Sequence, residues 1–159
     1  MGAAILAGLV LAYRTMGGTA TRQIEPGAAL RASLTAASDL AAELRRTLAE
    51  GAPLGASPAG PVRGGLQALR RRLDATAQQL ERIDVATLEE QPAAVHALIA
   101  VAVDELGWAV RLCAAPAYAS SQGMHDAAGA LQTHAAACLR DAAAALEPSA
   151  VAEEGEGSR

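Results

Sequence analysis

The sequence contains no Phe, no Lys and no Asn, and aromatic residues make up only 2% of its 159 residues. All 13 basic residues are therefore Arg, which indicates GC-rich coding, typical of a bacterial genome, and not a functional choice. The net charge of −4 and the pI near 5.3 give the chain no basic footprint for phosphates. We therefore expect no nucleic-acid partner.

Motifs that carry catalytic chemistry are also missing. The chain has no Gly-rich phosphate loop, no CxxC pair, no HExxH and no GxSxG. None of its three His residues has an acidic residue three positions before it, which excludes the Glu-x-x-His pattern of di-iron bundles. Its two Cys fit a reduced compartment better than a disulfide framework. We predict a cytoplasmic protein that is not an enzyme, with no catalytic residue, cofactor or assigned small molecule.

What the sequence does have is helical periodicity. The apolar residues are rich in Ala, the best helix former, and they recur at alternating spacings of three and four residues. This spacing predicts helices over 26–50, 62–90, 92–113 and 124–146. Pro26 and Pro92 suit the first turn of a helix. No stretch alternates apolar and polar residues over strand length. We predict an all-α, up-down four-helix bundle with a longer crossover linker over 51–61, GAPLGASPAGP.

Each predicted helix has its own core positions. In the first helix they are Leu30, Leu34, Ala37, Ala41, Leu44 and Leu48. In the second they are Leu66, Leu69, Leu73, Thr76, Leu80, Ile83 and Thr87. In the last they are Met124, Ala128, Leu131, Ala135, Cys138, Ala142 and Ala145. Spacing of this kind is typical of helices that pack along one another.

The two ends of the chain differ from this bundle, which we place at 24–147. Residues 1–23 hold an uncharged apolar run, Gly2 to Tyr13, which is shorter than the ~20 residues that a membrane-spanning helix requires. Three interpretations stay open: a short apolar helix packed in the bundle, a membrane anchor, or a signal segment. Residues 148–159 are acidic and without periodicity, which predicts a disordered tail.

The helix predicted over 92–113 is the most apolar one. Its first half, AAVHALIAVAV, is apolar on every side except at His96, so we expect it to be enclosed. Its second half is amphipathic and places Asp104, Trp108 and Arg111 on one stripe. A Trp beside an Arg on a wet helix face is typical of protein interfaces. We expect Trp108 to be a residue at the edge of the core, buried in its body and wet at its N–H. An interface anchor is the alternative, and it makes these three residues our interface candidates.

One residue pair has the spacing of metal ligands. His134 and Cys138 lie four residues apart, on the same face of the predicted last helix. If the last two helices form a hairpin that turns near Tyr118, residues whose numbers sum to about 236 lie level, and His96 comes near Cys138. A metal site of His96, His134 and Cys138 is therefore a speculative alternative to simple packing. The same hairpin places Cys113 too far from Cys138 for a disulfide, so we expect free thiols.

Two clusters of charge are expected to be ordinary surface. Three consecutive residues, Arg70 to Arg72, fan around their helix instead of forming one edge, and the adjacent Glu89 and Glu90 diverge. The leading hypothesis is thus a non-enzymatic helical-bundle protein that acts through protein–protein interaction or self-association. The alternatives are a membrane-tethered cytoplasmic domain of a transport or sensory assembly, at the inner membrane, and a metal- or small-ligand-binding bundle.

Overall fold

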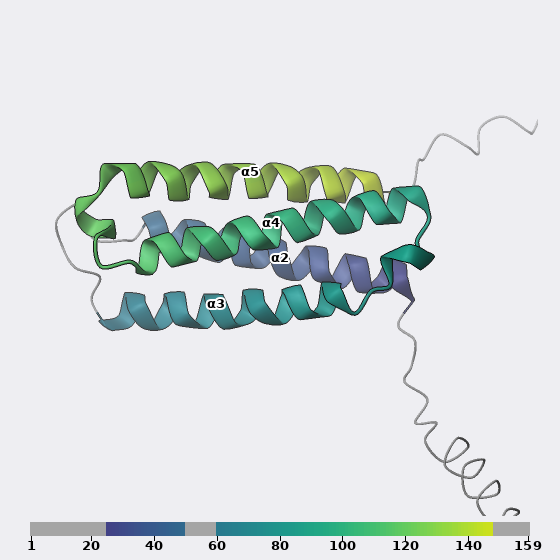
Figure 1. The fold of residues 1–159 in the computed structure, drawn as a ribbon, viewed down its shortest axis with the longest axis horizontal. Coiled ribbons are helices and arrows are strands. Elements are labelled where there is room, and N and C mark those ends of the chain that lie inside the picture. The colour runs from purple at the N-terminus through teal and green to yellow at the C-terminus, as the bar shows by residue number, and fades with distance from the viewer. Residues whose placement is uncertain (1–24, 50–59, 148–159) are drawn as a thin grey trace, which may run out of the picture.

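The computed structural model describes residues 25–49 and 60–147 of the chain (Figure 1). The predictions for the apolar run Gly2 to Tyr13, for positions 51–59 of the linker and for the tail 148–159 lie outside the described residues. The described residues all belong to the predicted bundle domain, 24–147.

Within these described ranges the chain forms four α-helices and two short 3-10 turns. The helices are α2 (Pro26–Ala49), α3 (Gly60–Glu81), α4 (Glu90–Ala114) and α5 (Gln122–Leu146), and the turns are η1 (Val85–Thr87) and η2 (Tyr118–Ser120). No strand occurs in the described part of the chain, so the all-α prediction is confirmed. The ends of α2, α4 and α5 lie within two residues of the predicted ones.

The second helix ends earlier than the sequence suggested. The prediction continued it to Glu90, whereas α3 ends at Glu81. The Asp84 carboxylate accepts a hydrogen bond from the backbone N–H of Ala86 at 3.1 Å, and Thr87 Oγ1 donates to the Asp84 carbonyl at 2.7 Å. An Asp side chain that satisfies nearby backbone groups competes with helix formation. Thr87 is consequently exposed in η1. The prediction that Thr87 is a core residue is therefore wrong.

The four helices lie side by side, and the colour order in Figure 1 shows that consecutive helices run in opposite directions. α4 and α5 make the most extensive contact, and α2 and α4 each contact all three other helices. α2 and α4 therefore lie on the short diagonal of the bundle and contact each other directly.

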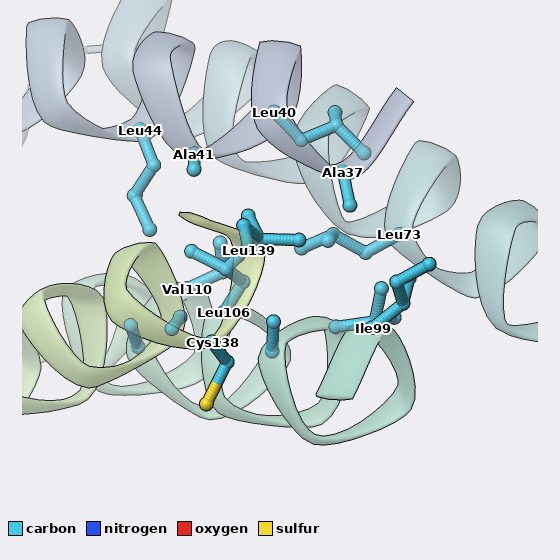
Figure 2. Close-up of a cluster of buried hydrophobic side chains, with 14 of the residues drawn as sticks. Ala37, Leu40, Ala41, Leu44, Leu73, Ile99, Leu106, Val110, Cys138 and Leu139 are labelled. Atoms are coloured by element: carbon cyan, nitrogen blue, oxygen red, sulfur yellow. The ribbon is translucent and has the colours of Figure 1, made fainter. Parts of the chain in front are cut away.

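The core combines two kinds of contact. Leucines fill the space around α2, and Figure 2 shows Leu44 of α2 extending towards the side of the core that holds Val110 and Leu139. The α4–α5 contact instead uses alanines with no exposed surface: Ala102, Ala109, Ala128, Ala135 and Ala142. Side chains this small let two helix backbones approach closely. Every predicted core position of α2 and α5 is buried or half-buried, so those predictions are confirmed.

Candidate functional site

One face of α4 is uncovered along its length. The residues of this face, called here the α4 stripe, are Ala94, Ala97, Val101, Asp104, Trp108 and Arg111, and all six are exposed. They repeat at alternating spacings of three and four residues, which is the spacing of a helix that packs against another helix. The first half of α4 is therefore not enclosed, contrary to the expectation. Periodicity could not reveal this, because that half is apolar on all sides.

Two features make the stripe unusual for a surface. Val101 keeps 44% of its surface exposed and Trp108 keeps 51%. The whole helix is also apolar: among the described helices, α4 alone is long and apolar enough to cross a membrane, with a mean hydropathy of 1.6. This is weak evidence for a membrane location, because core helices of soluble proteins have the same composition. The exposure of Val101 and Trp108 shows that the neighbouring helices leave part of the apolar surface of α4 uncovered.

Charged groups are placed within the stripe. The Arg111 guanidinium carbon lies 4.7 Å from the centre of the Trp108 ring, a cation–π distance. Asp104 lies one turn before Trp108 on the same stripe. No ion pair to another described residue engages Asp104 or Arg111. The stripe thus presents Trp108 between an acidic and a basic side chain.

A cleft of about 310 Å³ lies beside the stripe, between α3 and α4. Its apolar lining includes Leu73 and Val103, and its polar lining includes Glu81, His96 and Asp104. The volume is at the lower limit for small-ligand pockets. The His96 Nε2–H donates to the Leu80 carbonyl at 3.1 Å, in the last turn of α3. His96 therefore satisfies a helix end and joins α4 to α3.

A second cluster lies between α4 and α5. His134 Nδ1 is 2.7 Å from Glu105 Oε1 and 4.0 Å from Cys138 Sγ, and the three ligand atoms lie within 4.8 Å of one another. The structure thus brings His134 and Cys138 together, as their spacing predicted, but it places Glu105 beside them and not His96. The hairpin rule could have found Glu105, since 236 − 105 = 131 is within one turn of His134.

The electrostatics of this cluster are set by burial. Cys138 is 6% exposed, and the pKa of its thiol is raised. Desolvation is the main cause, and the negative charges of Glu105 and Asp141 add to it. The His134 side chain is 63% exposed and that of Glu105 is 20% exposed. Glu105 Oε2 is buried and has no hydrogen-bond partner among the described residues.

The other cysteine lies at the opposite end of the α4–α5 hairpin. Cys113 is buried against Tyr118, whose ring stacks on His125 with the ring centres 4.0 Å apart. Burial raises the pKa of the Cys113 thiol, and the hydrogen bond with Tyr118 opposes this effect. Cys113 and Cys138 are both free, as predicted from the hairpin geometry. A buried thiol with a raised pKa is a poor nucleophile.

The remaining charged groups stay at the surface. Arg72 forms an ion pair with Glu43, which connects α3 to α2. Glu89 and Glu90 are exposed at the start of α4. Exposed pairs of this kind contribute little to stability.

Comparison with known proteins gave no significant match to any family model, curated protein or solved structure. The function must therefore be argued from the α4 stripe and the α4–α5 cluster themselves.

Proposed function

We propose that this is a non-enzymatic helical-bundle protein of the cytoplasm that acts by self-association through the α4 stripe. The observation that carries the proposal is the exposure of Val101 and Trp108 on a helix face with regular packing spacing. Burial of such a face removes apolar surface from water, and Trp and Arg are the residues that most often concentrate binding energy in interfaces.

The charges of the stripe favour an antiparallel pair of α4 helices related by a two-fold axis. If the axis passes between positions 107 and 108, residues whose numbers sum to 215 lie level. Asp104 then faces Arg111 of the partner subunit, and each such contact occurs twice, as in any isologous interface. A parallel pair would instead place Asp104 against the same carboxylate of the second copy. Like charges in contact are unfavourable, so the antiparallel arrangement is the better one.

Gly107 provides room for the Trp in this arrangement. Trp108 lies level with Gly107 of the partner subunit when the numbers sum to 215. A Cβ atom added at Gly107 would meet no atom within 4 Å, so the surface there is open. A large ring can rest on a helix backbone at a glycine because no side chain intervenes. Shape and charge therefore support the same register.

The architecture proposed for the whole chain is an up-down four-helix bundle with a crossover linker over 51–61. A short apolar helix precedes the bundle at the N-terminus. The membrane-tethered alternative, with the bundle on the cytoplasmic side of the inner membrane, depends on residues 2–13. Fractionation distinguishes the two: recovery of the full chain without detergent supports the cytoplasmic protein, and recovery only with detergent supports the tether.

Analytical ultracentrifugation of the full chain tests self-association. The wild type is expected to form dimers, and Trp108→Ala is expected to weaken dimerisation by about 30-fold or more, because central Trp residues contribute roughly 2 kcal/mol or more. Trp108 is the single Trp of the chain, so its fluorescence reports directly on whether the stripe is covered. A wild type that stays monomeric at all accessible concentrations would contradict the proposal.

A charge exchange tests the register. Asp104→Arg and Arg111→Asp should each weaken the dimer, whereas the double variant should restore it, because both contacts are rebuilt with exchanged signs. Asp39→Arg, an exposed change on α2, is the matched control and should leave dimerisation unchanged. If the double variant is as weak as the single ones, the antiparallel register is wrong.

A further inference from the structure

The cluster between α4 and α5 unites three side chains of the kinds that bind zinc. Glu105 comes from α4, and His134 and Cys138 come from successive turns of α5. Carboxylates, imidazoles and thiolates are the side-chain groups that bind Zn²⁺ in proteins. A zinc site with three protein ligands keeps a fourth position for water. The sulfur and nitrogen donors favour zinc over calcium or magnesium, which prefer oxygen ligands alone.

Two of the three donor separations are close to those of a tetrahedral site, and the third, between Glu105 and Cys138, is at most 4.8 Å. Zinc–ligand bonds of about 2.0 to 2.3 Å at tetrahedral angles separate neighbouring donor atoms by roughly 3.3 to 3.6 Å. The observed separations are 2.7 Å from Glu105 Oε1 to His134 Nδ1 and 4.0 Å from His134 Nδ1 to Cys138 Sγ. Shifts of about 0.6 Å would bring both into range. The exposed His134 side chain is free to make them.

An independent observation at Glu105 points to a ligand. Its Oε2 atom is buried without a hydrogen-bond partner among the described residues, although the other carboxylate oxygen is paired with His134. Buried polar atoms are almost always satisfied, and a carboxylate oxygen left alone is costly. A cation bound beside Oε1 would compensate this buried charge.

The thiol is also oriented for such a role. Figure 2 shows the Cys138 sulfur directed away from Leu40 and Leu44, on the side of the cluster remote from α2. Cys138 occupies a core position by spacing, but its sulfur lies near an imidazole and a carboxylate. A thiolate and a carboxylate together supply two negative charges, which balance those of one Zn²⁺ ion.

From these observations we infer that Glu105, His134 and Cys138 form a zinc-binding site that links α4 to α5. The site is separate from the proposed function: it lies between α4 and α5, and none of its three ligands belongs to the α4 stripe. Zinc bound there would connect the two helices that already share the most extensive contact. Ions that bind only the folded protein raise its stability.

Cobalt titration of the metal-free full chain tests the site, because Co²⁺ replaces zinc and is coloured. The expected result is one equivalent bound, with a thiolate-to-cobalt charge-transfer band and visible bands of tetrahedral intensity, all abolished by one equivalent of Zn²⁺. Cys138→Ser should remove the charge-transfer band. Cys113→Ser is the matched control and should retain it, because Cys113 lies at the other end of the hairpin.

His134→Ala keeps the test independent of folding, because this side chain is largely exposed. Competition with a chromophoric chelator should show at least about 100-fold weaker zinc binding, since even outer-shell changes cost 10- to 100-fold. Glu105→Gln should also lower the zinc affinity. His96→Gln should leave the zinc affinity unchanged. A wild type that binds no cobalt at stoichiometric concentration, or a thiolate band that survives Cys138→Ser, would overturn the inference.

Discussion

At the scale of the residue, small side chains position the α4–α5 hairpin. Ser121 is the N-cap of α5, and its hydroxyl accepts a hydrogen bond from the backbone N–H of Met124 at 3.3 Å. The first N–H groups of a helix have no partner within the helix, so a cap satisfies a donor that would otherwise be lost. Tyr118 and His125 stack immediately beside this cap. The turn is thus defined by a few local contacts.

Removal of the cap is expected to have a measurable cost. Ser121→Ala should lower the free energy of unfolding by about 1 kcal/mol, because the Met124 N–H loses its acceptor. Urea unfolding followed by circular dichroism measures the change. Ser38→Ala, at an exposed position within α2, is the control and should be neutral or slightly stabilising, since Ala is the better helix former. Equal losses in both variants would show that the cap contributes nothing.

At the scale of the element, the packing of α4 against α5 depends on small residues in their contact. Ala109 and Ala135 have no exposed surface. Because protein interiors are close-packed, we expect a larger side chain at either position to force its neighbours apart. This close approach also brings Glu105 within reach of His134. The alanines therefore determine both the packing of this helix pair and the geometry of its polar cluster.

Enlarging one of these alanines should separate the helices. Ala135→Leu is expected to destabilise the protein by about 1 to 3 kcal/mol, because the added atoms force the backbones apart. It should also weaken zinc binding, since the Glu105–His134 distance would grow. Ala144→Leu, at an exposed position of the same helix, is the control for helix propensity and hydrophobicity. Thermal unfolding and the chelator competition measure the two effects, and unchanged stability in Ala135→Leu would contradict the close-packed interface.

At the scale of the whole molecule, the absence of Lys simplifies the response to alkaline pH. Between about pH 8 and pH 10.5, few groups besides the two Cys and two Tyr residues ionise, because Arg remains charged. Burial, the hydrogen bond with Cys113 and its charge raise the pKa of Tyr118 above the usual 10.0. Burial also raises the pKa of Cys113 above the usual 9.0. The folded protein therefore holds its protons more tightly than the unfolded chain does.

The direction of the pH effect follows from this difference. The stabilisation is fully present below about pH 8, where the thiols and phenols are protonated in both states, and it decreases as the pH rises, because the unfolded chain ionises first. We expect the urea midpoint to fall between about pH 8 and about pH 10.5. Tyr118→Phe should show a smaller fall, since one of the responsible groups is gone. A fall of the same size in wild type and variant would exclude Tyr118 as a cause.

The sequence by itself determined which segments are helical and, for most helices, which side is buried. Leu30, Ala37 and Leu44 in α2 are core residues because their spacing matches the helical repeat, and only one face of that helix is apolar. Pro92 lies in the first turn of α4, as expected, since no helix-internal donor is lost there. The spacing of His134 and Cys138 likewise placed them on one face.

Only the tertiary structure decided the end of α3 and the exposed face of α4. The hairpin rule places Glu105 within one turn of His134, but the rotation of each helix decides which side chains meet. Asp84 starts a separate 3-10 turn after α3 through bonds to Ala86 and Thr87, which the spacing of apolar residues does not reveal. The first half of α4 is apolar on every side except at His96, so the spacing of its apolar residues does not define a rotation around the helix axis. That rotation turns Glu105 towards His134, His96 towards Leu80 and Trp108 towards solvent. In this rotation Ala102 and Ala109, which have no exposed surface, face the rest of the bundle.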